Sequence, residues 1–564
     1  MKQLFVKNII LVCLLFFSNN LFSKSNFEGE NIIIHLDKSF YVTGEVMWYK
    51  VYLPKNFEGR PVTLKVSLLD KLNTTKHYSF HSTEGKSNFS SYYKIPFDTR
   101  SGVYSLIVSG IKTSTGKSVK IAEVTVPIYN DLEKVSVAAS DLAAPKNIIN
   151  NTPTISDNPL NVSVDLDKNA YTNRDQVNVV IKVTDSSGKP IQGNCSVAVT
   201  DKSIAGEMAM PSESVLGGAF PPNIIPNNLN NTINVRGLFL NKDNQPKKVE
   251  IMGIFSAKEN NFLFAGSNEE GSFSVEMPNF SGEKPIQFVN HYEIDNDVTV
   301  KLSEDVKREI KQDLVYTEGI IEYLKLSRER KKIFQMFDGF EFDVQSKGTK
   351  FEKQNLSPDK KYNLRNYSTF EDLPMFFSEV LTYLKFKKSG KQYIAQMTNP
   401  NPTWEGFYPG EPLFIVDGKI TRNADHVARM EYIHLEQVDL FFDAKKLKDQ
   451  FNVLGKSGVV TIETDLPKII LPKSDEARIF TVNGLQPPAN FPVFETSQVS
   501  NNKRLPFFRP QLYWNPDVTI QQNGEGRFSF TQTDDESTFT VKVLVQGENG
   551  EMGYGETIYE VKVR

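Results

Sequence analysis

The chain has 564 residues, of which 24% are charged and 11% aromatic, a composition typical of globular domains and long enough for several of them. Its 65 basic and 68 acidic residues leave a net charge of −3, and no long run of one sign stands out, so nucleic-acid binding has no electrostatic footprint. After the N-terminal segment no stretch approaches about 18 consecutive apolar residues, so we expect no transmembrane helix.

Residues 1–25 are predicted to be a signal peptide. Lys2 and Lys7 precede a short apolar stretch at 9–17, which is too short to span a bilayer comfortably. A buried N-terminal helix is the alternative interpretation. After cleavage Cys195 would be the sole cysteine, so no internal disulfide is expected. We therefore expect an exported protein of a bacterial envelope, in the periplasm or associated with the outer membrane, with the cell surface as the alternative.

A short phrase occurs twice, and each copy is followed by a run in which apolar residues alternate. The copies lie 130 positions apart and consist of Leu36, Asp37, Lys38, Tyr41 and Glu45, and of Leu166, Asp167, Lys168, Tyr171 and Asp175. The alternation predicts strands with one buried face. The duplication predicts two copies of one β-sandwich unit, a first module at 29–135 and a partial module at 158–204.

Two further β units are predicted later in the chain, at 232–302 and at 474–564. In the first, Gly271 belongs to a turn that feeds an alternating strand with Phe273, and the same turn-strand phrase returns with Gly526 and Phe528. Glycine suits the turn because it accepts positive φ values, and we expect each phenylalanine to pack on the inner face.

The region 303–340 has helical apolar spacing and is predicted to be a helical connector that begins at Ser303. A basic cluster at 328–332 suits the C-terminal end of this helix, and a patch for anionic partners is the alternative interpretation. A mixed α/β region follows at 367–466.

Three parts of the chain resemble β domains of known families. The phrase at 37–45 resembles the macroglobulin-like domains of the α2-macroglobulin superfamily, and the second copy is similar except that Arg174 replaces the usual glycine. The phrase at 513–517 is similar to a macroglobulin-type strand. Residues 232–302 resemble the carboxypeptidase regulatory-like domain.

The sharpest resemblance lies in the α/β region. Residues 411–418, 435–439 and 455–464 resemble, in this order, the plug domain of TonB-dependent outer-membrane receptors. Only about 100 residues follow Thr464, and they have the pattern of a β-sandwich, so we do not expect the receptors' transport function to carry over. The combined order resembles a class of Bacteroidetes-type envelope proteins with macroglobulin-like domains and a plug without a barrel.

Residues suited to catalysis or metal binding are not grouped in the sequence. Cys195 lies in an alternating strand without the Cys–Gln motif of a thioester trap. His77 and His81 are four residues apart in an expected strand, about 13 Å from each other and too far to share a metal. Asp417 precedes Gly418 and is expected to form a turn. With no nucleophile, zinc or phosphate-loop motif, we expect a non-enzyme without cofactor or metal.

Aromatic residues in two Pro-rich stretches are the candidate interaction residues. They are Trp404, Phe407 and Tyr408 in the loop 399–412, and Phe507, Phe508 and Arg509 in the crossing 482–510. Aromatic and arginine side chains on loops are typical interface anchors, and packing onto their own domain is the alternative.

The predicted fold is mainly β, with β-sandwiches of macroglobulin or immunoglobulin-like type, a helical connector and a small α/β plug-like domain. The predicted function is that of a non-catalytic scaffold and docking module of the envelope. The expected partner is an outer-membrane protein complex, with a barrel protein as one candidate. The alternatives are a surface adhesin or glycan-binding protein, and a macroglobulin-like protease inhibitor that lacks a thioester.

Overall fold

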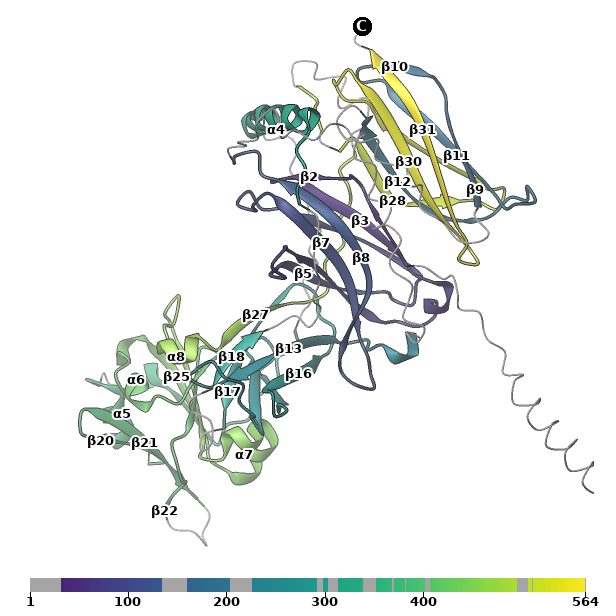
Figure 1. Cartoon of the computed structure of the whole chain (residues 1–564). Helices are drawn as coiled ribbons and strands as arrows, with labels where there is room; N and C mark the ends of the chain where they lie inside the picture. Colours follow the sequence, from purple (N-terminus) through teal and green to yellow (C-terminus); the bar gives the residue numbers. More distant parts are fainter. Residues whose placement is uncertain are drawn as a thin grey trace, which may run out of the picture.

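The computed structural model describes residues 32–133, 160–202, 226–291, 298–302, 313–337, 351–367, 370–380, 382–400, 406–493, 506–509 and 511–562. These residues form a mainly β molecule of several stacked units, as the sequence predicts (Figure 1). The predicted signal peptide lies outside the described residues. Within them, no helix combines the length and the apolar character that a membrane span requires.

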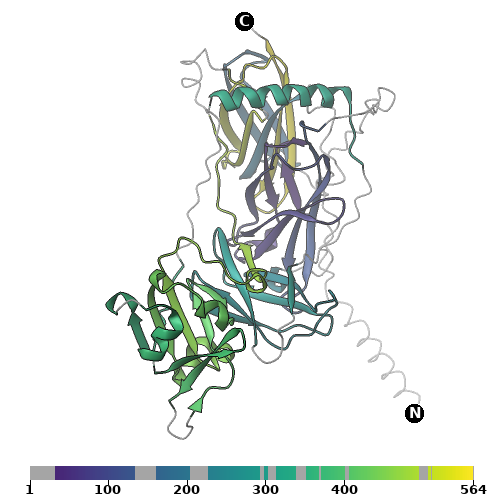
Figure 2. The ribbon, with the colours of Figure 1, turned by 90° about the vertical axis from the view of Figure 1, so that its left-hand side faces the viewer.

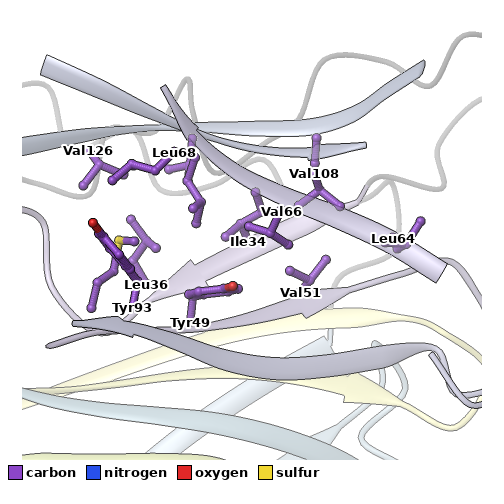
Figure 3. Packing of buried hydrophobic residues seen from close by; sticks show 14 of the residues in the cluster. Ile34, Leu36, Tyr49, Val51, Leu64, Val66, Leu68, Tyr93, Val108 and Val126 are labelled. Atoms are coloured by element: carbon purple, nitrogen blue, oxygen red, sulfur yellow. The ribbon is translucent and has the colours of Figure 1, made fainter. Parts of the chain in front are cut away.

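The first sandwich consists of two sheets that face each other across an apolar core. Sheet orders are β1-β3-β6 and β2-β8-β7-β4-β5. The elements are β1 (Ile33–Leu36), β2 (Tyr41–Val42), β3 (Val46–Tyr52), η1 (Lys55–Phe57), β4 (Thr63–Leu69), β5 (Thr75–Ser82), β6 (Asn88–Lys94), β7 (Gly102–Ile111) and β8 (Ser118–Tyr129). Figure 3 shows Tyr49 and Val51 of β3 pointing toward Val66 and Leu68 of β4, as the predicted alternation requires.

The second sandwich is built from two segments that are far apart in the chain. Its elements are β9 (Leu160–Leu166), β10 (Ala170–Thr172), β11 (Gln176–Thr184) and β12 (Gly193–Asp201), together with β28 (Tyr513–Ile520), β29 (Glu525–Thr531), β30 (Thr538–Gly547) and β31 (Met552–Lys562). They hydrogen-bond in the order β28-β12-β30-β31-β9-β11-β29, with β10 on β31. Strands of the predicted modules at 158–204 and 474–564 therefore form one sandwich, because they interleave as hydrogen-bonded neighbours and share one apolar core.

A small sandwich lies between the two halves in sequence. Its sheets have the orders β16-β13-β18 and β15-β14-β17-β27. The elements are η3 (Pro226–Asn228), β13 (Ile233–Leu240), β14 (Met252–Ser256), β15 (Asn261–Ala265), β16 (Ser272–Met277), β17 (Glu283–Asn290), β18 (Thr299–Leu302) and β27 (Ile479–Asn483). Strand β27 falls within the range predicted as the final β module, yet it completes this small sandwich.

The α/β unit surrounds a five-stranded sheet of order β19-β25-β26-β23-β24, with a small β20-β21-β22 sheet beside it. Its elements are β19 (Lys360–Asn363), η4 (Leu364–Asn366), α5 (Leu373–Glu379), β20 (Leu384–Ser389), β21 (Gln392–Asn399), β22 (Gly406–Phe407), β23 (Leu413–Val416), β24 (Lys419–Thr421), α6 (Ala424–Ala428), η5 (Tyr432–His434), β25 (Leu435–Phe441), α7 (Ala444–Phe451), η6 (Asn452–Gly455) and β26 (Val459–Thr464). Helix α8 (Lys473–Glu476) follows. Asp417 turns the chain with φ of 45°, and its carboxylate accepts bonds from Thr464 N and Oγ1 at 2.9 and 2.6 Å.

Helix α4 (Glu318–Phe337) is the described part of the predicted connector. The predicted start at Ser303 lies outside the described residues. Figure 2 shows α4 running across the end of the two large sandwiches, away from the α/β unit. The helix therefore lies at the two large sandwiches, although the strands before and after it in the chain, β18 and β19, belong to the small sandwich and the α/β unit.

Candidate functional site

The first copy of the repeated phrase forms a hydrogen-bonded turn. The carboxylate of Asp37 accepts a bond from the Tyr41 hydroxyl at 2.6 Å and one from the Trp48 N–H at 2.9 Å. The carboxylate of Glu45 accepts the Val42 N–H at 2.9 Å. The phrase thus fixes the start of β3 against the preceding turn.

The second copy repeats this geometry in a different setting. Asp167 accepts the Tyr171 hydroxyl at 2.6 Å. Gly44 and Arg174 occupy equivalent positions, and both have a left-handed backbone, with φ of 85° and 64°. A side chain at Gly44 would overlap the Phe97 ring, whereas Arg174 reaches outward and binds Asp534 through Nε and Nη2, each at 2.6 Å. The departure from glycine noted in the sequence therefore adds an ion pair between the two halves of the second sandwich.

Burial distinguishes the two copies. In the first copy Lys38 forms a buried ion pair with Glu45, and Tyr323 of α4 donates to the other oxygen of Glu45 at 2.9 Å. Burial raises the pKa of Asp37 to about 7, in spite of the nearby Lys38. At Asp167, partial burial acts in the same direction, but hydrogen bonds from Tyr171 and its neighbours outweigh it and lower the pKa.

Ion pairs attach α4 to both large sandwiches. Arg330 pairs with Asp535 of the second sandwich, and both side chains are almost fully buried. Lys331 pairs with Asp131 of the first sandwich at 2.8 Å, and Arg328 donates to the backbone carbonyl of Asp131. Three members of the predicted basic cluster thus bind acidic residues or backbone of this chain and hold the helix across the junction.

Three predicted interaction residues lie at this same junction. Phe507 is 4% exposed, and its N–H donates to Asp534 at 2.8 Å. The Arg330 guanidinium lies 5.1 Å from the centre of the Phe508 ring. Arg509 lies over the Phe507 ring at 5.7 Å. The structure therefore brings these three residues together, against α4 and the second sandwich.

The other predicted interaction residues belong to the α/β unit. Trp404 lies outside the described residues. Tyr408 is half-buried, and its hydroxyl donates to the Phe442 carbonyl at 2.8 Å, so it packs onto its own unit.

Phe407 lies at the end of the α/β unit in a lysine-rich tip, which comprises Lys385, Lys387, Lys388, Lys391 and Phe407. The ammonium groups of Lys385 and Lys387 lie 5.4 and 5.0 Å from the centre of the Phe407 ring. All four lysines are exposed. Figure 1 shows β20, β21 and β22 at the end of the molecule opposite the second sandwich. The tip combines an aromatic ring with positive charge, an arrangement that suits binding of an acidic surface.

A buried polar interface joins the first and second sandwiches. His35 Nδ1 and the Tyr52 hydroxyl bind Ser196 Oγ at 2.5 and 2.6 Å. Lys50 donates to the Pro516 carbonyl at 2.6 Å. Burial lowers the pKa of His35 to about 3 and that of Lys50 to about 8. These groups are buried with hydrogen-bond partners, which fixes the relative position of the two sandwiches.

A groove that the sequence did not indicate lies between the first sandwich and the small sandwich. Its volume is about 660 Å³. It is lined mainly by β4, β5 and β7 on one side and by β13, β18 and β27 on the other. The charged lining residues are all basic: Lys65, Lys76, Arg236 and Lys301. Such a groove escapes sequence reasoning because its walls come from segments more than 100 residues apart.

The residues weighed for metal binding and catalysis are packed in the structure. His77 stacks on Tyr93 and His81 on Phe89, with ring centres 4.2 and 4.9 Å apart, and burial lowers the pKa of the two histidines to about 4 and about 3. Burial raises the pKa of Cys195 to about 12. No group of three or more His, Cys, Asp or Glu residues in the described part of the chain is placed to hold a metal ion.

Comparisons with known proteins add a distant likeness to solved structures. No family model and no curated protein matches the chain. Trypsin-activated alpha-2-macroglobulin from Escherichia coli is 9% identical over 95% of this chain and 41% of its own, with a TM-score of 0.23. Salmonella alpha-2-macroglobulin reacted with methylamine is 8% identical over 95% and 40%, with a TM-score of 0.23. The fibronectin(III)-like modules of Clostridium thermocellum CbhA are 11% identical over 48% and 91%, with a TM-score of 0.12.

The chain thus spans about two fifths of the length of these alpha-2-macroglobulins. At such TM-scores the likeness carries no argument about function, which has to come from the residues of this chain.

Proposed function

We propose that the protein is a non-catalytic, exported scaffold of a bacterial envelope that presents its α/β unit as a docking module. The observation that carries the proposal is the nested arrangement of the chain. The small sandwich and the α/β unit are inserted between β12 and β28, which are neighbours in one sheet. Because β12 and β28 are hydrogen-bonded to each other, the two ends of the insertion are held at one position in the second sandwich, and the inserted units extend from there.

Packing continues from one unit to the next along the molecule. The α/β unit contacts the small sandwich through an apolar cluster that includes Phe255, Leu413 and Phe451. Gln287 of the small sandwich exchanges two hydrogen bonds with the backbone of Ile420, each at 2.7 Å. Together with α4 and the interface at Ser196, these contacts support a stiff arm that holds the lysine-rich tip at one end.

The proposed partner is an acidic surface of an outer-membrane protein complex, with a barrel protein as one candidate. The tip supports this choice because two of its exposed lysines, Lys385 and Lys387, lie over the half-buried Phe407 ring at the end of the arm. Charged and aromatic residues of this kind set the encounter rate and anchor the contact.

The test is chemical cross-linking and co-purification of the tagged chain from envelope extracts in mild detergent. The variant Phe407→Ala with Lys387→Glu should lose most of any specific partner. A matched control, Lys189→Glu, reverses an exposed charge in a turn of the second sandwich and should keep it. Equal recovery of the partner with both variants, or a chain that stays monomeric in these extracts, would contradict the proposal.

Two alternatives lead to different results. A surface adhesin or glycan-binding protein would be cleaved by protease added to intact cells, whereas a periplasmic scaffold would be protected. A protease inhibitor without a thioester would form a lasting complex with the protease after cleavage in the stretch 205–231.

A further inference from the structure

We propose that the outer edge of β20, in the lysine-rich tip, receives an extended acidic segment of a partner protein as an added strand. This edge belongs to the site of the proposed docking function, on which the proposal rests and which it deepens by naming the kind of segment bound. Three features of the tip support it: an unpaired strand edge, a covered edge on the other side of the same sheet, and lysines without acidic partners beside the open edge.

Strands β20 and β21 form a hairpin whose geometry shows which backbone groups face outward. Only two residues separate Ser389 from its partner Gln392, and the first of them, Gly390, has φ of 64°, so the hairpin closes on a hydrogen-bonded pair. Such pairs recur at every second residue of an antiparallel ladder. The Thr398 N–H donates to the Tyr383 carbonyl at 2.7 Å, as this alternation requires. The even-numbered residues of β20 therefore turn their N–H and carbonyl groups away from β21.

These outward groups have no partner in the described part of the chain. Strand β20 is the end strand of its sheet and pairs with β21 alone. No hydrogen bond from a described residue reaches the outward backbone groups of Leu384, Phe386 and Lys388. The side chains of Lys387 and Lys388 are exposed, so a partner has access to this part of the edge. A row of unpaired backbone groups is what peptide-binding domains use in β-augmentation.

The chain itself covers the opposite edge of the same small sheet. The N–H groups of Tyr393 and Ala395 in β21 donate to the carboxylates of Asp425 at 2.9 Å and of Glu411 at 3.1 Å. Further along, β22 pairs with β21. One edge of the hairpin is thus satisfied within the chain, whereas the edge of β20 is left for a partner.

Positive charge without an acidic partner lies beside the open edge. Lys385 and Lys387 have their ammonium groups 5.4 and 5.0 Å from the centre of the Phe407 ring. Lys387 also donates to the side-chain oxygen of Gln396 at 2.8 Å, which leaves its charge uncompensated. Neither these two lysines nor Lys388 forms an ion pair with a described residue. Their charge is therefore available to the carboxylates of a partner.

The register of β20 defines the side-chain pattern of the added strand. Directly opposite residues of paired strands project from the same face and lie about 5 Å apart. Acidic residues are therefore favoured opposite Lys385 and Lys387. Phe386 projects from the other face, where its ring packs against that of Phe377 of α5 at 5.3 Å, so an apolar residue is favoured opposite Phe386. The segment should thus alternate acidic with apolar side chains.

A second copy of this chain does not suit the edge. Two β20 edges that paired with each other would place lysines opposite or next to lysines, and like charges in such positions are destabilising. Lysines on edge strands commonly prevent self-pairing in this way. The same charges favour an acidic segment, so they select the occupant as well as excluding the wrong one.

The test is fluorescence anisotropy of a fluorescein-labelled ten-residue peptide, in which glutamate alternates with valine, titrated with the full chain. Two N-methylated peptides report the binding mode, one methylated at the valine amides and the other at the glutamate amides. Alternate amides of a strand point to opposite edges, so one of them should bind like the parent peptide and the other at least tenfold more weakly. The same peptide with lysine in place of glutamate should also bind at least tenfold more weakly.

Two variants at one position separate the strand edge from its charge. Lys388→Pro removes an outward N–H that β21 does not use, so the hairpin keeps its ladder while the edge loses a donor. We expect it to weaken peptide binding at least tenfold, whereas Lys388→Ala keeps the N–H and should weaken binding no more than threefold. Circular dichroism confirms that each variant is folded.

A charge reversal tests the lysines without a change to the backbone. Lys387→Glu should weaken peptide binding by about tenfold, because an attraction becomes a repulsion. Lys189→Glu, in a turn of the second sandwich, is the matched control and should bind normally. Both side chains are exposed, so neither variant disturbs a core.

Several results would overturn the proposal. They are no binding of the acidic peptide at millimolar concentration, equal affinity of the two N-methylated peptides, equal affinity of folded Lys388→Pro and Lys388→Ala, and unchanged affinity of Lys387→Glu.

Failure of the added strand and failure of the docking function give different results in envelope extracts. If folded Lys388→Pro recovers the partner as well as Lys388→Ala does, while Phe407→Ala with Lys387→Glu loses it, the tip docks without the strand edge and the proposal is wrong. If the peptides and variants behave as expected but no partner is recovered, the docking function fails and the strand-binding edge stands.

Discussion

Acidification should weaken the interface between the two large sandwiches through His35. The side chain is fully buried, and its pKa is lowered to about 3, first by burial and then by the nearby Lys542 and Lys50. In the unfolded chain the pKa of histidine is about 6.5. Because the unfolded state binds the proton more tightly, stability is complete above about pH 6.5 and falls as the pH drops toward 3.

The size of the effect follows from this difference in pKa. At pH 5.0 the unfolded chain gains about 2 kcal/mol from protonation of this one histidine, while the folded state gains almost nothing. The groups that face His35 offer little compensation, since Ser196 is neutral and the Trp514 ring lies edge-on at 5.2 Å. His81, whose pKa is also lowered to about 3, should add a similar amount.

The assay is urea unfolding at pH 7.5 and 5.0, followed by the fluorescence of Trp48 and Trp514, which are both buried near this interface. Trp404→Phe removes the third tryptophan from every sample. The variant His35→Gln keeps a hydrogen-bonding group near Ser196 but cannot titrate.

From pH 7.5 to 5.0 the parent should lose about 2 kcal/mol more unfolding free energy than His35→Gln. His434→Gln, at a histidine on the surface of the α/β unit with 39% of its side chain exposed, is the matched control and should follow the parent more closely. If His35→Gln loses as much stability on acidification as the parent, the reasoning is refuted.

Three further predictions follow from buried or strained groups. Removing Arg330 leaves the carboxylate of Asp535 buried without its ion-pair partner, so Arg330→Ala should weaken the attachment of α4 by about 3 kcal/mol. Hydrogen exchange should then become faster in the helix and stay unchanged elsewhere. The pKa of Lys50 is lowered to about 8, mainly by burial, so stability should rise from pH 8 to 10.5 by about 3 kcal/mol, and this rise should be absent in Lys50→Met when both are followed by urea unfolding. Arg174 has φ of 64°, so Arg174→Gly should be about 1 kcal/mol more stable than Arg174→Ala in thermal unfolding, because both lose the ion pair but only alanine keeps the strained Cβ.

Local pattern was sufficient to predict the strands and the repeated turn. The alternating residues that begin at Met47 and Val177 lie in β3 and β11. In both copies of the repeated phrase, the aspartate accepts a hydrogen bond from the tyrosine hydroxyl. The helix at Glu318–Phe337 falls within the range predicted from apolar spacing. These features depend on neighbours within about a dozen residues, which a sequence displays directly.

Pairing between distant segments was not predictable from pattern. Strand β12 pairs with β28 and β30, more than 300 residues later, and no local signal distinguishes these partners from any other apolar strand. The position of the neighbouring Phe508 was not predictable either, since Arg330, which lies over its ring, comes from a helix far away in the chain. The groove was missed for the same reason.

The two copies of the repeated phrase indicate how one turn serves two purposes. In both copies an aspartate and a tyrosine set the turn, so the shared residues account for local geometry alone. The residues that differ make the contacts beyond the turn. Gly44 leaves room for Phe97, so that this turn is packed and Glu45 can receive Tyr323 of α4, whereas Arg174 accepts a strained backbone and reaches Asp534 in the other half of its sandwich. The two copies therefore share the residues that set the turn and differ in the residues that attach it to its surroundings, so variation at Gly44 or Arg174 should alter packing around the turn and leave the turn's own hydrogen bonds in place.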